Sequence, residues 1–236
     1  MPPTAEDLTV GRLDLPRPSA APGPPPPPGT HRLGLGTRRD GLLVVPPAAA
    51  GPDGVPLVVA LHGAGGSGEQ MVDLLGPTAR EHGFVLLAPD SRARTWDVIA
   101  GGYGPDVLFT GEAMAHATAS VRVDPARTAV CGFSDGASYA LSLGIANGDV
   151  FSAVVAYSPG FSAAVVRHGA PRIFVSHGVE DRVLPVARCS RRLVPRLRDE
   201  GYDVRYLEFA GGHTVPAAVI RESLPWLLGT VVEPPA

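Results

Sequence analysis

The stretch VCGFSDGASYA, residues 130–140, places a serine between two glycines at the point where an apolar run meets an alanine-rich one. Glycine weakens a packed strand or helix unless the backbone there needs an unusual conformation or a very close approach. Gly132, Ser134 and Gly136 form the pattern G-x-S-x-G, which is typical of a sharp strand-to-helix corner with an exposed serine hydroxyl. Ser134 is therefore a candidate nucleophile, and a helix N-cap serine is the alternative interpretation of this motif taken alone.

Around this corner, short apolar runs alternate with longer segments of helical pattern. The expected strands are 57–61, 84–88, 128–132, 152–157, 172–176 and 204–209, and the expected helices are 67–82, 106–121, 134–147, 186–200 and 215–228. Strands that are apolar throughout and are joined by helices predict a parallel sheet covered on both faces. Residues 31–35 and 41–45 predict an antiparallel pair at the sheet edge. The fold class is α/β, a doubly wound, mostly parallel sheet with an antiparallel N-terminal entry.

Three chemically useful side chains follow strands of this sheet at their carboxyl ends, where such sheets bind ligands. They are Ser134, Asp181 and His213. The chain order of nucleophile, acid and base is that of the α/β-hydrolases and differs from other serine-hydrolase folds. We expect His213 to act as the base and Asp181 to fix its tautomer, with Glu180 as the alternative acid.

The segment HGAGG, residues 62–66, follows the expected strand 57–61 and completes this set. In this fold an oxyanion hole takes one backbone N–H from the residue after the nucleophile and one from a loop after an earlier strand. These donors are expected to be Asp135 and Ala64, with Gly65 as the alternative to Ala64. An ordinary glycine-rich turn is the other interpretation of the segment.

With HGAGG, GFSDG, the Asp181 loop and GGH in this order, the chain resembles the bacterial serine esterases of the phospholipase/carboxylesterase group. Dienelactone-hydrolase-like and polyhydroxyalkanoate-depolymerase-like branches of the α/β-hydrolase superfamily are near relatives, and the resemblance covers about residues 31–230. It implies a serine carboxylesterase-type hydrolase that works through an acyl-enzyme. Thioester hydrolysis, amide hydrolysis and acyl transfer use the same machinery. A non-catalytic ligand-binding protein of this fold is the alternative from another class, although such proteins usually lose one of the three side chains.

The substrate side of the expected site depends on two segments. Only about a dozen residues separate the expected strands 152–157 and 172–176, too few for a helical lid domain, which predicts an open site for small or short-acyl esters. The segment SRARTWD after the strand 84–88 looks like the loop that borders the pocket in the resembled group. The candidate pocket residues are Trp96, Tyr103, Phe133 and Phe161.

The composition excludes several other functions. A net charge of −3 gives no electrostatic reason to expect nucleic acid or an anionic membrane as a partner. All 20 basic residues are arginine, so Schiff-base, Ser–Lys and P-loop chemistries are excluded. No metal-ligand or dinucleotide-binding spacing is found, and neither a metal nor a cofactor is expected. The expected partner is a small-molecule ester, and a monomer and a homodimer are equally compatible with the sequence.

The first 30 residues contain ten of the 26 prolines. Because proline lacks a backbone donor, residues 1–30 are expected to form a poorly ordered arm outside a single domain at 31–230, with 231–236 as a tail. A proline-rich ligand for a partner is the other interpretation of the arm. Cys131 and Cys189 are expected as unpaired thiols, and neither a signal peptide nor a membrane-spanning run is evident. These features predict a cytoplasmic protein without a membrane anchor.

Overall fold

The computed structural model describes residues 9–15, 25–50 and 53–230. Its strands are β1 (Gly29–Arg32), β2 (Gly41–Val45), β3 (Val55–Leu61), β4 (Val85–Pro89), β5 (Val123–Phe133), β6 (Ala153–Tyr157), β7 (Arg172–Gly178) and β8 (Val204–Phe209). Its α-helices are α2 (Gly68–His82), α3 (Pro105–Ser120), α4 (Asp135–Ala146), α5 (Ser190–Asp199) and α6 (Ala217–Leu227), and the short 3-10 helices are η1 (Pro47–Ala50) and η2 (Asp97–Ala100).

All eight strands form one sheet in the order β1-β2-β4-β3-β5-β6-β7-β8. Pairing is parallel from β4 through β8, whereas β2 pairs antiparallel with both β1 and β4. The predicted mostly parallel sheet with an antiparallel entry is confirmed. Because Gly41 lies opposite Pro89, the start of β2 reaches the same edge as the carboxyl ends of the parallel strands.

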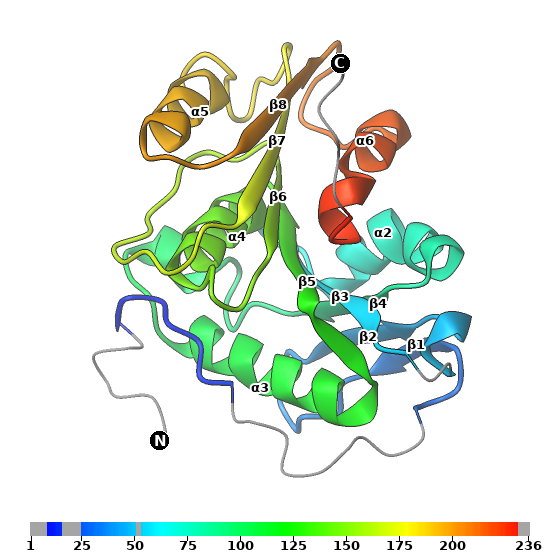
Figure 1. Cartoon of the computed structure of the whole chain (residues 1–236). Coiled ribbons are helices and arrows are strands. Elements are labelled where there is room, and N and C mark those ends of the chain that lie inside the picture. The colour runs from blue at the N-terminus through cyan, green and yellow to red at the C-terminus, as the bar shows by residue number, and fades with distance from the viewer. Residues whose placement is uncertain (1–8, 16–24, 51–52, 231–236) are drawn as a thin grey trace.

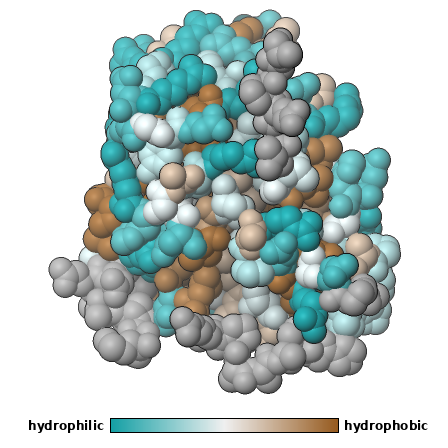
Figure 2. All heavy atoms as spheres, viewed as in Figure 1, coloured by the Kyte–Doolittle hydropathy of each residue, from teal (hydrophilic) through white to brown (hydrophobic). Residues whose placement is uncertain are grey.

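Helices cover both faces of the sheet (Figure 1). Helices α2 and α6 lie on one face, and α3, α4 and α5 lie on the other. Successive residues of β3 alternate between the two apolar clusters, with Val59 in the cluster of α4 and Val58 in the cluster of α2. A strand that is buried on both faces needs no polar alternation, which explains the fully apolar pattern of β3. Hydrophobic residues on the face seen in Figure 2 form separate patches among hydrophilic ones.

The connection between β6 and β7 contains no helix, so the prediction of a sheet without a lid domain at this position is confirmed. None of the helices in the described part of the chain is long and apolar enough to cross a membrane. Cys131 and Cys189 are both buried and unpaired, as expected.

Two short parts of the expected N-terminal arm instead belong to the domain. Strand β1 begins at Gly29, and residues 9–15 pack against the end of α4. Arg12 pairs with Asp149, and the Leu13 N–H donates to Asn147 Oδ1 over 2.9 Å. The expectation of an arm over all of residues 1–30 was wrong here because these parts find polar partners on the domain. The arm's residues 1–8 and 16–24 and the expected tail at 231–236 lie outside the described residues.

Candidate active site

Ser134 lies at the corner between β5 and α4, in a backbone conformation that non-glycine residues rarely adopt. Its φ is 58° and its ψ is −120°, and its N–H donates to the Tyr157 carbonyl over 3.0 Å. A Cβ on Gly132 would meet the Gly136 carbonyl, and a Cβ on Gly136 would meet the carbonyl of Leu61. The two glycines therefore allow β5, α4 and the end of β3 to approach closely enough to hold this corner.

A chain of hydrogen bonds joins Ser134 to two side chains from later loops. His213 Nε2 lies 2.9 Å from Ser134 Oγ, and His213 Nδ1 lies 2.6 Å from Asp181 Oδ2. With Asp181 ionised, Nδ1–H donates to the carboxylate and Nε2 accepts from the serine hydroxyl. The structure thus brings together Ser134, Asp181 and His213, whereas the alternative acid Glu180 is exposed.

The Asp181 carboxylate is buried and well supplied with hydrogen bonds. Its Oδ1 accepts the backbone N–H groups of Val183 and Leu184, each over 2.8 Å. Burial alone would raise the pKa of Asp181, but the hydrogen bonds from His213 and these two amides outweigh it and lower that pKa below its usual value. Asp181 therefore remains an anion facing the imidazole at neutral pH.

His177, four residues before Asp181, is a neighbour whose contact with the carboxylate the sequence did not reveal. Its Nδ1 lies 2.7 Å from Ser190 Oγ, and its Nε2 lies 2.7 Å from the Leu184 carbonyl and 3.3 Å from Asp181 Oδ2. Burial lowers the pKa of His177, so the ring is neutral and donates from Nε2, while Nδ1 accepts from Ser190. The His177 ring thus holds the Asp181 loop in place through its contacts with the Leu184 carbonyl and the Asp181 carboxylate.

The HGAGG loop places one free N–H group beside the nucleophile. A Cβ on Gly63 would lie 3.4 Å from Ser134 Cβ, so the two segments are in contact. Three N–H groups of the loop have protein acceptors: Gly63 donates to Gln70 Oε1, Gly65 to the Arg94 carbonyl and Gly66 to the Gly63 carbonyl. Within the described residues, Ala64 N–H has no acceptor. The alternative donor Gly65 is occupied, whereas Ala64 and the first N–H of α4, on Asp135, can bind an incoming anion.

His62 fixes the direction in which the Ala64 N–H points. The Ser91 N–H donates to His62 Nε2 over 3.0 Å, so the ring proton sits on Nδ1 and donates to the Gly63 carbonyl over 2.7 Å. The N–H of a trans peptide points opposite to its carbonyl, so anchoring the Gly63 carbonyl also orients the Ala64 N–H. Burial lowers the pKa of His62, which favours this neutral ring.

The expectation that Trp96 lines the substrate pocket was wrong. Its side chain is fully buried, with its indole stacked on Tyr139 at a centroid distance of 5.0 Å. Its Nε1–H donates to the His62 carbonyl over 2.8 Å. Burial of the Trp96 indole is favourable because the core supplies both an aromatic ring to stack on and an acceptor for its N–H.

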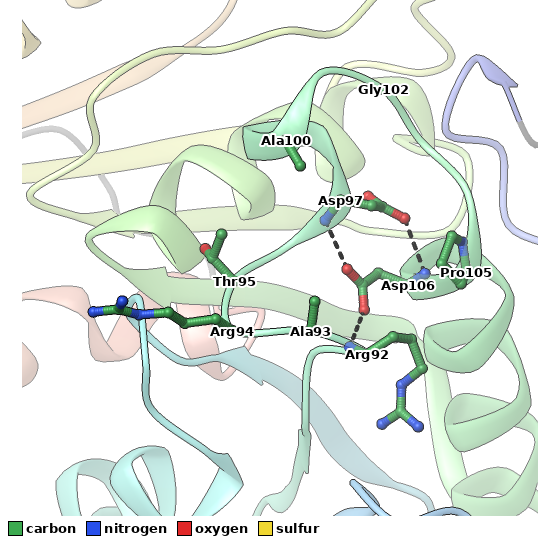
Figure 3. A pocket seen from close by; sticks show the side chains of 9 residues that line it. All are labelled: Arg92, Ala93, Arg94, Thr95, Asp97, Ala100, Gly102, Pro105 and Asp106. Atoms are coloured by element: carbon green, nitrogen blue, oxygen red, sulfur yellow. Dashed lines mark hydrogen bonds between the residues drawn. The ribbon is translucent and has the colours of Figure 1, made fainter.

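Two carboxylates, the buried Asp106 and the half-buried Asp97, organise the loop that carries Trp96 (Figure 3). Asp106 accepts the N–H groups of Arg92 and Asp97, and Asp97 Oδ2 accepts those of Gly104 and Asp106. Burial raises the pKa of Asp106 to about 6 and also raises the pKa of Asp97. The loop borders a cavity of about 350 Å³. Its lining residues are Arg92, Ala93, Arg94, Thr95, Asp97, Ala100, Gly102, Pro105 and Asp106.

The other three candidate pocket residues have different surroundings. The Tyr103 hydroxyl donates to the Ala163 carbonyl over 3.1 Å, away from the catalytic candidates. The Phe133 ring packs on His213 with a centroid distance of 4.8 Å, so it supports the imidazole. Phe161 is exposed and follows Gly160, whose N–H donates to Ser138 Oγ one helical turn after the nucleophile. Of the three, Phe161 is the exposed side chain, whereas Tyr103 and Phe133 are half-buried.

The sheet order, the strained serine corner and its hydrogen-bonded histidine and aspartate are features of an α/β-hydrolase. Comparison with solved structures agrees. The chain is similar to esterase PE8, with 25% identity and a TM-score of 0.63 over 83% of this chain and 100% of that one. It is also similar to a phospholipase/carboxylesterase from Dyadobacter fermentans, with 20% identity and a TM-score of 0.60 over 79% and 94% of the two chains. The chain has the α/β-hydrolase fold, and its structural neighbours include bacterial esterases and phospholipase/carboxylesterases, as the sequence resemblance predicted.

In sequence, the chain is 33% identical over 126 residues to "Putative esterase NocK" of Nocardia uniformis subsp. tsuyamanensis. The match spans 50% of this chain and 37% of that protein, so the relative is much the longer of the two. No protein-family model matches the chain.

Proposed function

We propose that this protein is a serine hydrolase that cleaves carboxylic esters through an acyl-enzyme. The observation that carries the proposal is the continuous hydrogen-bond chain from Asp181 through His213 to the Ser134 hydroxyl, with distances of 2.6 and 2.9 Å. A serine hydroxyl is a weak nucleophile until a base removes its proton, and this arrangement supplies the base and orients it. The esterase names of the relatives support the same reaction class.

In the proposed reaction, His213 Nε2 takes the Ser134 proton as Oγ attacks the ester carbonyl carbon. The carbonyl oxygen becomes an oxyanion, which the N–H groups of Ala64 and Asp135 bind. The intermediate collapses, the C–O bond to the alcohol breaks, and His213 gives its proton to the leaving oxygen. Water then attacks the acyl-enzyme with His213 again acting as base, releasing the acid and restoring Ser134. Asp181 stabilises the imidazolium in both halves.

The substrate is proposed to be a small or short-acyl ester. The support is the β6–β7 connection, which carries no helical lid. The Thr95 hydroxyl donates to Asp135 Oδ2, so the loop of Thr95 lies next to the nucleophile corner. A cytoplasmic location is proposed on the support of the two unpaired buried thiols.

The test is hydrolysis of p-nitrophenyl esters from acetyl to palmitoyl by the wild type and by Ser134→Ala. We expect turnover of the short chains and a loss of at least about 10⁴-fold in kcat for the variant. Ser152→Ala is the matched control, because Ser152 precedes β6 at the opposite edge of the sheet and donates to the Thr128 carbonyl. A folded wild type that hydrolyses no ester would contradict the proposed activity, and a preference for palmitoyl would contradict the proposed substrate size.

A further inference from the structure

The loop at residues 91–96 is connected to both segments that hold the candidate oxyanion donors. The Arg94 carbonyl accepts the Gly65 N–H over 2.7 Å, next to Ala64. The Thr95 hydroxyl donates to Asp135 Oδ2 over 2.7 Å, next to Ser134. Arg94 therefore lies at the rim of the candidate active site, although it is distant from Ser134 in sequence.

The Arg94 side chain is exposed and lies over the oxyanion loop. Its Nε is 3.7 Å from the position that a Cβ on Gly65 would take. Arg92 and Arg94 point to opposite sides of the loop (Figure 3). Gly65 and Gly63 are at most about 7 Å apart along the chain, and Gly63 contacts Ser134. Arg94 therefore lies beside the same short loop that contacts Ser134.

The neighbouring arginines are already engaged, whereas Arg94 is not. Arg39 donates to the carbonyls of Ser91 and Gly66, and Arg92 donates to the Asp90 carbonyl and lies 3.4 Å above the Phe109 ring centroid. Across the described residues, no carboxylate pairs with the Arg94 guanidinium. The exposed Arg94 guanidinium, which has no paired carboxylate among the described residues, is available to bind an anionic group of a ligand.

The carboxylates near Arg94 already accept hydrogen bonds from other groups. Asp97 in η2 and Asp106 in α3 accept backbone N–H groups of the segment from Arg92 to Asp106. The Asp135 carboxylate accepts the Thr95 hydroxyl and sits at the positive N-terminal end of α4, which offsets its charge. The rim beside the oxyanion loop therefore carries an exposed arginine that no carboxylate of the described residues pairs with.

We propose that Arg94 is a specificity-determining residue that binds a carboxylate carried by the substrate, so that the preferred esters are half-esters of short dicarboxylic acids. This inference rests on the proposed ester hydrolysis. The guanidinium pairs with the distal carboxylate through charge-assisted hydrogen bonds, while Ser134 attacks the ester carbonyl at the other end. Arginine suits this role because its planar group matches a carboxylate and stays charged at all working pH values.

The experiment compares p-nitrophenyl hemiglutarate, which carries a carboxylate, with neutral p-nitrophenyl hexanoate of similar length. For the wild type we expect kcat/KM to favour hemiglutarate by about tenfold or more. Arg94→Gln should lower this ratio by about 10- to 100-fold, which corresponds to one charge-assisted hydrogen-bonded pair. The ratio should also fall with added salt, because the pair lies at the surface.

Arg122→Gln is the matched control, because Arg122 is an exposed arginine at the amino end of β5, on the opposite edge of the sheet. It should keep the wild-type ratio. A wild type that hydrolyses both esters equally well, or a ratio unchanged in Arg94→Gln, would overturn the role of Arg94 and leave the proposed function standing. A folded wild type that hydrolyses neither ester would overturn the proposed function and this inference with it.

Discussion

Two segments meet beside Ser134, and they are held in place by different forces. The β5–α4 corner depends on the absence of atoms, because the positions of Gly132 and Gly136 have no room for a Cβ. The loop at 91–104 depends on the presence of hydrogen-bond acceptors, because the carboxylates of Asp97 and Asp106 accept backbone N–H groups of this segment. The corner should therefore be sensitive to added volume and insensitive to pH, and the loop should show the reverse.

The largest effect is expected from Gly136→Ala. The new methyl group would overlap the carbonyl of Leu61 in a central strand that cannot move away. We expect the free energy of unfolding to fall by about 4 kcal/mol or more, at the upper end for an overpacked site, together with loss of ester hydrolysis. Urea unfolding measures the first effect. Gly102→Ala is the loop counterpart, since a Cβ there meets nothing within 4 Å, and it should change stability by less than about 0.5 kcal/mol.

Asp97→Ala should have the next largest effect. It leaves the N–H groups of Gly104 and Asp106 without their acceptor, at a cost of about 2–4 kcal/mol. Asp97→Asn keeps one carbonyl oxygen in place of Oδ2 and should recover at least half of this loss. Equal destabilisation by the alanine and asparagine variants in urea unfolding would show that the hydrogen bonds to Oδ2 do not hold the loop.

A smaller effect should appear in the pH dependence. Burial raises the pKa of Asp106 from 3.8 to about 6, so the folded state holds this proton more tightly than the unfolded state. The contribution of Asp106 to the free energy of unfolding therefore decreases as pH rises from about 4 to 6, by roughly 2–3 kcal/mol in total.

Asp106→Asn removes this titration, so the wild-type-minus-variant difference in stability reports Asp106 together with its electrostatic coupling to Asp97, whose charge helps to raise the pKa of Asp106. Asp181 and Glu208 have pKa values lowered from 3.8 and 4.5, that of Glu208 to about 2, so their contributions change near and below these ordinary values and cancel in the difference. A wild-type-minus-variant difference that stays flat between pH 4 and 6 would contradict the assignment. Gly132 and Gly136 have no titratable side chain, so the corner adds no such slope.

The smallest effect is expected from Thr95→Val, which removes the side-chain hydrogen bond between the loop and the corner. The Asp135 carboxylate would then be solvated by water, so stability should fall by about 1 kcal/mol or less. The ester kcat/KM should fall by about three- to tenfold, because the Asp135 N–H loses one constraint on its orientation. Unchanged kinetics in this variant would show that the two segments position themselves independently.

The same contrast explains how much could be predicted from the sequence. The corner could be predicted because its requirements are local: glycine, serine and glycine at fixed spacing between an apolar strand and a helix. The partners Asp181 and His213 followed from topology, since parallel strands end at one edge. The loop at 91–104 could not be predicted, because Trp96 turns inward only once Tyr139 and the His62 carbonyl are in place. Nor does the sequence indicate that the carboxylates of Asp97 and Asp106 accept backbone N–H groups.

The segment at residues 9–15 has a consequence for the order of folding. Its hydrogen bonds to Ala146, Asn147 and Asp149 join residues 134 to 137 positions apart in the chain. Closing so large a loop is entropically costly, and a few hydrogen bonds at its end repay little of that cost. During synthesis this segment leaves the ribosome well before α4 but finds its partners only after α4 has emerged. It should therefore dock after α4 has formed and exchange its amide hydrogens sooner than the central strands of the sheet in the native protein.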